Sequence, residues 1–119
     1  SGCPLRSPYA ASKWAAIGLA KTWAMELGPW NIRVNALCPG SMSGPRIEGV
    51  INRDAEARGM EADDIRRVYQ RQGSLRQFTD PEDIAAMVSF LAGPGGKNVS
   101  GQAIAIDGHT ESLANWLDP

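Results

Sequence analysis

The sequence predicts an α/β fold built on a parallel sheet, and two observations support this prediction. An Ala-rich helical stretch over residues 8–27 leads directly into a stretch of alternating β-branched residues over 32–38. A second helical stretch, which begins after Asp80, is followed by a short apolar stretch at 102–107. Helices that alternate with strands in this way are typical of a parallel sheet.

The first helix is apolar on nearly all sides. Pro8 is tolerated in a first helical turn, and Gly28 ends the pattern. The helix carries three charged side chains: Lys13, Lys21 and Glu26. We therefore expect it to be buried on nearly all sides, against the sheet and a second subunit. Gly18 in its middle costs about 1 kcal/mol relative to Ala, so we expect a neighbouring backbone close to it.

The strand over 32–38 ends at Pro39-Gly40 and is followed by a long excursion. This excursion carries two short amphipathic helices, over 45–58 and about 62–72, and each is followed by a glycine. Their apolar stripes are narrow, so they cover a surface without being enclosed by it. An excursion of this length between a strand and the next packed helix is typical of a lid or a binding segment.

The last helix has clear start and stop signals. Asp80 suits the N-cap, Pro81 suits the first helical position, and Gly93-Pro94 ends the helix. A Gly-rich loop then leads to the strand at 102–107, which Gly108 ends.

Composition excludes several classes of protein. The chain has 119 residues, 43% of them hydrophobic and 21% charged, which is typical of a folded globular domain. The formal net charge of −1 gives no reason to expect nucleic acid or an anionic membrane as a partner. No stretch is long and apolar enough to span a membrane. The two cysteines, Cys3 and Cys38, indicate reduced thiols in the cytoplasm rather than a disulfide scaffold.

No metal site is predicted. Asp107, His109 and Glu111 alternate at the end of the last strand and could be mistaken for a ligand set. Zinc and iron sites of this kind use at least one further histidine, so a ligand role is not favoured.

Tyr9 and Lys13 are the residues with the clearest chemical potential. They are four apart on the first helix, so both side chains leave from one face. An ammonium about 4 Å from a phenolate stabilises it by roughly 4 kcal/mol at an effective dielectric constant near 20, which suits proton exchange near neutral pH. By spacing alone the simpler interpretation is favoured, in which the tyrosine is a helix-start aromatic and the lysine reaches solvent.

Three segments, taken together, resemble the short-chain dehydrogenase/reductase family. They are Tyr9-x-x-x-Lys13 on a helix, Asn35-x-x-x-Pro39-Gly40 at the end of a strand, and Asp107-Gly108 at the end of the last strand. Their order and spacing agree with the family pattern over the whole chain. The resemblance implies the C-terminal part of a doubly wound parallel-sheet fold of the Rossmann type, with the N-terminal dinucleotide-binding half absent.

The resemblance also implies roles for the residues of these motifs. Tyr9 is the general acid/base at the reacting oxygen, Lys13 assists it and bonds the nicotinamide ribose, and both contact the cofactor. Pro39 and Gly40 lie in the loop along the nicotinamide, and the backbone near Met42 holds its carboxamide. The cofactor is NAD or NADP. In the family, the residues that choose between them, the Gly-rich loop and the catalytic serine all precede the tyrosine.

One departure from the family lies just after Pro-Gly. The family usually has a threonine there that contacts the cofactor, and in this chain Gly44 takes its place. Ser41 and Ser43 offer hydroxyls nearby, and Arg46 offers a charge for the pyrophosphate or for an acidic substrate. These three residues are candidate positions of a substrate lid.

The resemblance divides residues 1–119 into three parts of one domain. They are a catalytic helix and strand (1–40), a substrate-binding lid (41–77), and a last helix, strand and tail (78–119). It implies a cytoplasmic NAD(P)-dependent oxidoreductase that interconverts a secondary alcohol and a ketone. It also implies a homo-oligomer, a dimer or tetramer, formed through the 8–27 helix and the last strand.

Two alternatives remain open at this point. One is a non-catalytic member that uses the scaffold for binding or regulation. The other is an inactive fragment, and the 119-residue chain alone is expected to have no dehydrogenase activity.

Overall fold

Residues 7–110 are described by the computed structural model. In chain order they form the following elements: helix α1 (Ser7–Leu27), strand β1 (Ala36–Pro39), helices α2 (Pro45–Arg58), α3 (Ala62–Gln70) and α4 (Pro81–Ala92), and strand β2 (Ala103–Ile106). Single 3₁₀ turns follow α1 and α4: η1 (Gly28–Trp30) and η2 (Pro94–Gly96). The predicted α/β class is confirmed.

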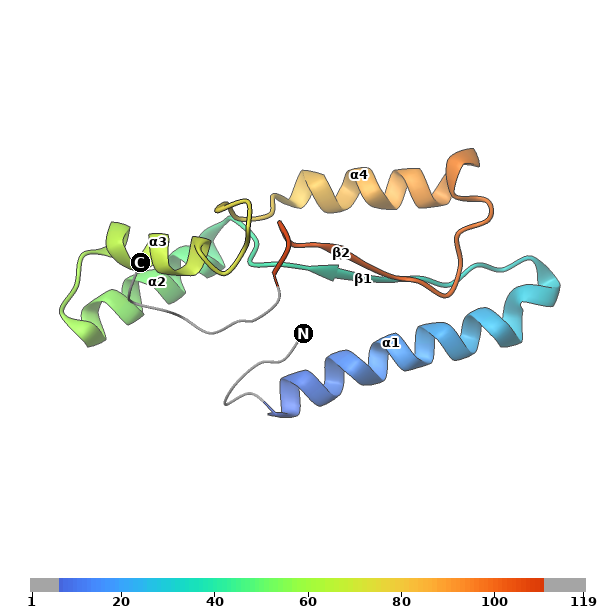
Figure 1. Ribbon diagram of the computed structural model, residues 1–119, viewed down its shortest axis with the longest axis horizontal. Coiled ribbons are helices and arrows are strands. Elements are labelled where there is room, and N and C mark those ends of the chain that lie inside the picture. Colours follow the sequence, from blue (N-terminus) through green and yellow to red (C-terminus); the bar gives the residue numbers. More distant parts are fainter. Residues whose placement is uncertain (1–6, 111–119) are drawn as a thin grey trace.

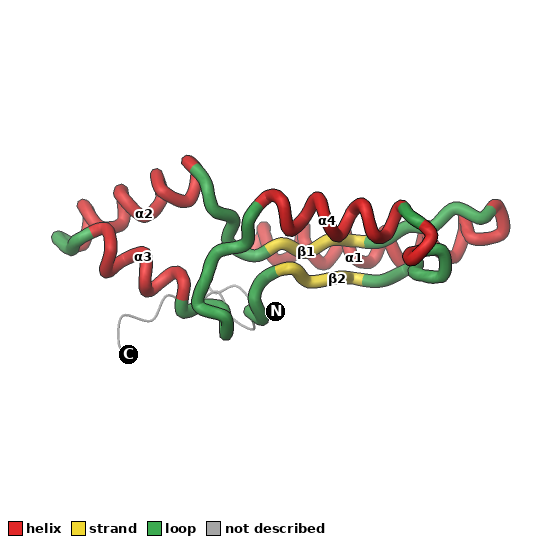
Figure 2. The backbone as a smooth tube through the Cα atoms, turned by 90° about the horizontal axis from the view of Figure 1, so that it is seen from above, coloured by secondary structure: helices red, strands yellow, loops and turns green. Residues whose placement is uncertain are grey.

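The two strands pair in parallel. Their register runs from Ala36 opposite Ala103 to Pro39 opposite Ile106. Helices α1 and α4 lie on opposite sides of the strands, which gives three layers (Figure 1). Helices α2 and α3 extend beyond the end of the strands (Figure 2), and the principal extents of the molecule are 56 × 28 × 23 Å.

Chain direction places the start of α1 at the carboxyl end of the sheet. Each strand follows a helix that runs the opposite way, so the N-termini of α1 and α4 lie at the end where both strands finish (Figure 1). Open parallel sheets bind their ligands at this end. The fold therefore brings Tyr9 and Lys13 to the same end of the sheet as Pro39 and Asp107.

The N-terminus of α4 is stabilised by a reciprocal capping box. The Asp80 side chain accepts a hydrogen bond from the third helical residue, and the Asp83 side chain accepts one from the Asp80 N–H at 2.9 Å. Pro81 occupies the first turn, where its missing N–H costs no bond. The predicted N-cap is confirmed.

At the other end of α4, Arg33 ties the helix to the segment that precedes β1. Its Nη1 donates hydrogen bonds to the C=O groups of Leu91 and Gly96, both at 2.6 Å. The last carbonyls of a helix have no partner within the helix, so the guanidinium supplies one. The loop before β1 and the end of α4 are thereby held together.

The first strand is shorter than predicted, since it begins at Ala36 instead of Ile32. The preceding residues bond to the loop before β2, and the Val34 C=O accepts a hydrogen bond from the Gly101 N–H at 2.7 Å. The Val34 N–H donates to the Ser100 hydroxyl at 3.1 Å, and the Asn35 side chain bonds two backbone groups of the same loop at 3.0 and 3.1 Å. Because of these bonds, regular pairing of the two strands begins only at Ala36.

The second helix of the excursion also ends earlier than predicted, at Gln70 rather than at residue 72. A tight turn follows, in which the Gly73 N–H donates to the Gln70 C=O at 3.3 Å. Gly73 then forms an antiparallel bridge with Thr110, just after β2. The helix ends early because the chain turns here to reach the end of the sheet.

Helix α1 is largely exposed within the described residues, contrary to the prediction that it is buried on nearly all sides. Ala20 is its buried residue, whereas Trp14 and Met25 are 58% and 82% exposed. Outside its own helix, no described atom lies within 4 Å of a Cβ built at Gly18, so the expected close backbone is not among residues 7–110. None of the helices in this range is long and apolar enough to cross a membrane.

Arg33→Ala is expected to lower the free energy of unfolding by about 2–3 kcal/mol, because the carbonyls of Leu91 in α4 and Gly96 in η2 lose a charged donor. Chemical denaturation followed by circular dichroism measures this change. Arg53→Ala is the matched control, since Arg53 is exposed and forms no ion pair within residues 7–110. We expect the control to stay within about 0.5 kcal/mol of the parent, and equal effects would contradict the role of Arg33.

Candidate active site

Tyr9 and Lys13 lie in the first two turns of α1, at the carboxyl end of the sheet. Their spacing of four residues places both side chains on one face of the helix. Tyr9 is 50% exposed, and Lys13 is half-buried. The Tyr9 side chain is therefore accessible to a small molecule.

Strand β1 ends in a contact that has no room for a side chain. The Gly40 N–H donates to the Ile106 C=O at 3.1 Å, immediately beyond the paired strands. A Cβ at Gly40 would lie 2.9 Å from both the Cα and the Cβ of Asp107. Glycine is required here by this close approach, and Pro39 before it is exposed. The Pro39-Gly40 pair thus lies at the carboxyl end of the sheet, the same end as Tyr9.

The chain next forms a single bridge between Met42 and Thr79. The Thr79 N–H donates to the Ser41 C=O, and the Ser43 N–H donates to the Thr79 C=O, both at 2.9 Å. In a parallel bridge these bonds belong to the neighbours of Met42, so its own N–H and C=O point away from Thr79. Within residues 7–110 these two groups form no hydrogen bond. They are a free donor and acceptor at the end of the sheet.

Thr79 anchors this bridge and was missed by the sequence prediction. It is 7% exposed, and its hydroxyl donates to the Ile106 C=O at 2.9 Å. It therefore joins the segment before α4 to the end of β2. A threonine before a helix N-cap has no distinctive sequence signal, because its partner lies 27 residues later in the chain.

The three candidate lid residues differ in what they can still bind. Ser41 uses its C=O in the bridge, and the Ser43 hydroxyl donates to Asp80 Oδ1 at 2.6 Å. Arg46, in the first turn of α2, is exposed and forms no ion pair within the described residues. Gly44 has φ = +134°, a conformation that a threonine adopts only with strain.

Residues 44–78, which we call the α2–α3 segment, have a hydrophobic core of their own. Ile51, Ala55 and Ile65 are buried between the two helices. The Tyr69 hydroxyl also donates across the helices to Asp54 Oδ2 at 3.2 Å. These contacts lie inside the segment and hold α2 against α3.

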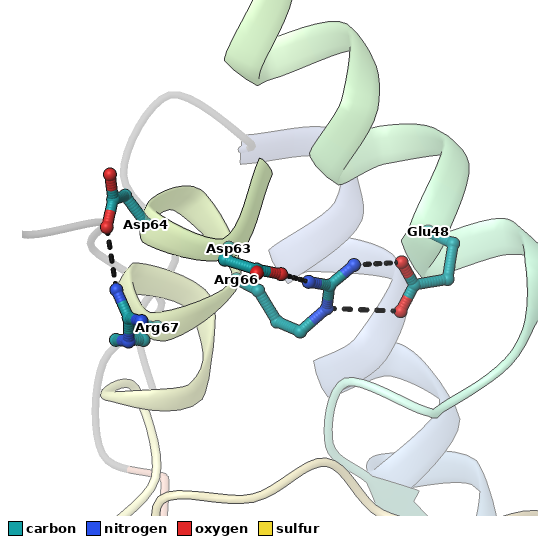
Figure 3. Close-up of polar contacts among 5 residues, drawn as sticks. All are labelled: Glu48, Asp63, Asp64, Arg66 and Arg67. Atoms are coloured by element: carbon teal, nitrogen blue, oxygen red, sulfur yellow. Dashed lines mark hydrogen bonds and ion pairs between the residues drawn. The ribbon is translucent and has the colours of Figure 1, made fainter. Parts of the chain in front are cut away.

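Ion pairs add to the contact between the two helices (Figure 3). The Arg66 guanidinium donates to both Glu48 on α2 and Asp63 on its own helix, and Arg67 pairs with Asp64 at 2.6 Å. The hydrogen bond with Glu48 raises the pKa of Arg66 further above its usual range. The ion pair of Arg66 with Glu48 links α2 to α3.

The end of β2 is engaged in backbone contacts. Asp107 Oδ1 accepts a hydrogen bond from the His109 N–H at 2.9 Å, and the Asp107 C=O accepts one from the Thr110 hydroxyl at 2.8 Å. Among residues 7–110 no group of three histidine, cysteine or acidic side chains is arranged to hold a metal ion. Glu111, and likewise Cys3, lie outside the described residues.

Comparison with protein families finds one clear match. A family model described as enoyl-(acyl carrier protein) reductase matches residues 1–109. The 3-oxoacyl-(acyl-carrier-protein) reductase FabG of Thermotoga maritima is 39% identical over 107 residues, which cover 90% of this chain and 39% of that protein. A D-beta-hydroxybutyrate dehydrogenase of Rhizobium meliloti is 32% identical over 106 residues, 88% of this chain and 41% of its own length.

Solved structures agree with these relatives. A short-chain dehydrogenase family protein from Francisella tularensis has a TM-score of 0.78 and 31% identity, and the match covers 84% of this chain and 41% of that one. An actinorhodin polyketide ketoreductase with NADPH has a TM-score of 0.80 and 29% identity, covering 91% and 41%. The chain thus spans about two fifths of the length of the proteins it matches.

Gly40→Ala is expected to destabilise the protein by about 1–3 kcal/mol, because the new methyl group would push the two strand ends apart. Thermal and chemical denaturation measure this cost. The same change at Gly28, where no described atom lies within 4 Å of a Cβ, is the matched control and should be close to neutral. A Gly40→Ala protein as stable as the parent would show that the contact with Asp107 relaxes freely.

Proposed function

Because the chain belongs to the short-chain dehydrogenase/reductase family, we propose that it carries the catalytic groups of an NAD(P)-dependent oxidoreductase. The reaction is the interconversion of a secondary alcohol and a ketone. The observation that carries this proposal is the position of Tyr9 and Lys13, one helical turn apart at the carboxyl end of the parallel sheet. Relatives named for ketone reduction or alcohol oxidation support it.

The residues at this end of the sheet fit the nicotinamide half of such a cofactor. The free N–H and C=O of Met42 match the acceptor and donor of a carboxamide, and the Lys13 ammonium suits the ribose hydroxyls. Pro39 and Gly40 form the backbone surface along the ring. When bound, the dinucleotide supplies or accepts the hydride at the substrate carbon. The residues named here do not determine the choice between NAD and NADP.

Tyr9 moves the proton in this mechanism. In the direction of reduction its phenol donates the hydroxyl proton to the carbonyl oxygen of the substrate, which becomes a hydroxyl group, and Tyr9 is left as a phenolate. In the direction of oxidation the phenolate takes the proton from the alcohol. The positive charge of Lys13 favours the phenolate in both directions, and the exposure of Tyr9 leaves room for the substrate.

The α2–α3 segment, residues 44–78, forms most of the substrate lid in this proposal, which we place at residues 41–77. Its internal core and ion pairs support movement as one body. Arg46, exposed in the first turn of α2, is the side chain of the lid best suited to an acidic group of a substrate. Residues 1–40 and 78–119 supply the frame that holds the lid.

The exposed apolar side chains of α1 favour association with further polypeptide. Trp14, Trp23 and Met25 are 58%, 48% and 82% exposed, and apolar groups of this size are usually covered in the working protein. A homo-oligomer formed through α1 and the last strand is the arrangement we propose. We place the protein in the cytoplasm.

A non-catalytic member of the family is the competing function. Such a protein has no need of a tyrosine and a lysine one turn apart at the ligand end of the sheet. Oxidation of NADH and NADPH in the presence of a panel of ketones, by the full-length protein that carries this chain, separates the two. Dinucleotide binding without turnover on any ketone would favour the non-catalytic function.

Tyr9→Phe in the full-length protein is expected to reduce turnover by at least about 100-fold, because the proton donor is removed. The ring is kept, so the affinity for the dinucleotide should change less than about two-fold. Steady-state kinetics and a fluorescence titration with NADPH or NADH measure the two quantities. Turnover within a few-fold of the parent would contradict the role assigned to Tyr9.

Lys13→Met is expected to lower turnover and also to weaken dinucleotide binding, because the ammonium serves both the phenolate and the ribose. The same kinetic and binding measurements apply. Lys21→Met is the matched control on the same helix, since its Nζ donates to the Gly101 C=O at 2.7 Å, away from the candidate site. Unchanged dinucleotide affinity in Lys13→Met would remove the ribose role.

A further inference from the structure

The two ends of the α2–α3 segment are joined by a side-chain hydrogen bond. The Ser43 hydroxyl donates to Asp80 Oδ1 at 2.6 Å, across 37 residues of sequence. Hydrogen bonds of this length from a hydroxyl to a carboxylate are roughly twice as strong as those between neutral groups. They also fix the direction of the donor more narrowly.

Both neighbours of Met42 are therefore held by rigid parts of the fold. Ser43 is tied to Asp80, the N-cap residue of α4. Ser41 is tied to Thr79, whose hydroxyl is anchored on the last residue of β2. The peptide groups around Met42 are left with little freedom to rotate.

We propose that Ser43 and Asp80 are positioning residues that aim the backbone of Met42 at the nicotinamide carboxamide. The inference rests on the proposed function, because it assumes that Met42 holds that group. Neither side chain touches the cofactor in this arrangement. They act by holding the N–H and C=O of Met42 in one orientation before the cofactor arrives, which reduces the ordering needed on binding.

Gly44, the residue after Ser43, explains why the hydrogen bond from Ser43 to Asp80 is needed. Gly44 has φ = +134°, and no described atom lies within 4 Å of a Cβ built on it, so no side chain packs against this position. Its C=O accepts a hydrogen bond from the Glu48 N–H at 3.2 Å in the first turn of α2. Glycine is the residue with the greatest conformational freedom. The bond from Ser43 to Asp80 adds to the backbone bonds with Thr79 and limits rotation between Met42 and Gly44 further.

The test compares two ligands in the full-length protein. NADPH or NADH carries the nicotinamide ring, whereas ADP-ribose shares the remainder of NADH but has no nicotinamide for Met42 to hold. Ser43→Ala is expected to weaken binding of the dinucleotide about five-fold to ten-fold, with the affinity for ADP-ribose unchanged. Isothermal titration calorimetry gives both affinities, and a loss confined to the dinucleotide is not expected from general destabilisation.

Two further variants make the result specific. Ser43→Thr keeps the hydroxyl and should restore dinucleotide affinity to within about two-fold of the parent. Asp83→Ala removes the other half of the capping box but leaves the bond from Ser43 to Asp80. It should lower the melting temperature without changing the ratio of the two affinities.

The possible results separate this inference from the function on which it rests. If the parent binds neither ligand, the proposed function fails. If the parent binds both ligands but Ser43→Ala leaves their ratio unchanged, the positioning role fails alone. Should Ser43→Ala not fold, Asp80→Asn provides the same comparison, since it keeps an acceptor but removes its charge. An unchanged ratio in Asp80→Asn would then overturn the proposal.

Discussion

The close approach of Gly40 to Asp107 is the constraint on which the rest of the structure depends. Two parallel strands of four residues each supply few ladder bonds, and the contact at their carboxyl end keeps them together where the chain leaves the sheet. From Gly40 the chain turns to the bridge at residue 79. From Asp107 it turns to meet Ser74, whose N–H donates to the His109 C=O at 3.0 Å. The α2–α3 segment is thus attached to the carboxyl end of the sheet both where it begins and near where it ends.

Helix boundaries were the most predictable feature, because their causes are local. Gly59 ends α2 in the left-handed conformation, and Asp80 with Asp83 starts α4. The start of β1 could not be predicted in the same way. Val34 and Asn35 have strand-like neighbours, but their bonds go to side chains and backbone of a loop more than 60 residues away. The burial of α1 depends on contacts that residues 7–110 do not contain.

The same contrast between local and long-range contacts applies to the candidate site. Tyr9 and Lys13 share one helix, so their spacing alone brings them together. The bond from Ser43 to Asp80 joins residues 37 positions apart, and in the sequence each has a sufficient local explanation. A serine in a loop and an aspartate at an N-cap give no sign that they meet. Long-range pairs of small polar side chains therefore have to be found in the structure.

The joined ends of the α2–α3 segment also bear on how this protein can change. Closing a loop costs conformational entropy that grows slowly with length, about 0.6 kcal/mol for each doubling. Since the chain is joined at Ser43 and Asp80, we expect that the helices between them, residues 45–70, can be lengthened, shortened or replaced with little effect on the sheet or on Tyr9. In the proposed function, substrate preference and proton transfer then depend on separate parts of the fold. Natural variation or directed evolution can alter the first while leaving the second intact.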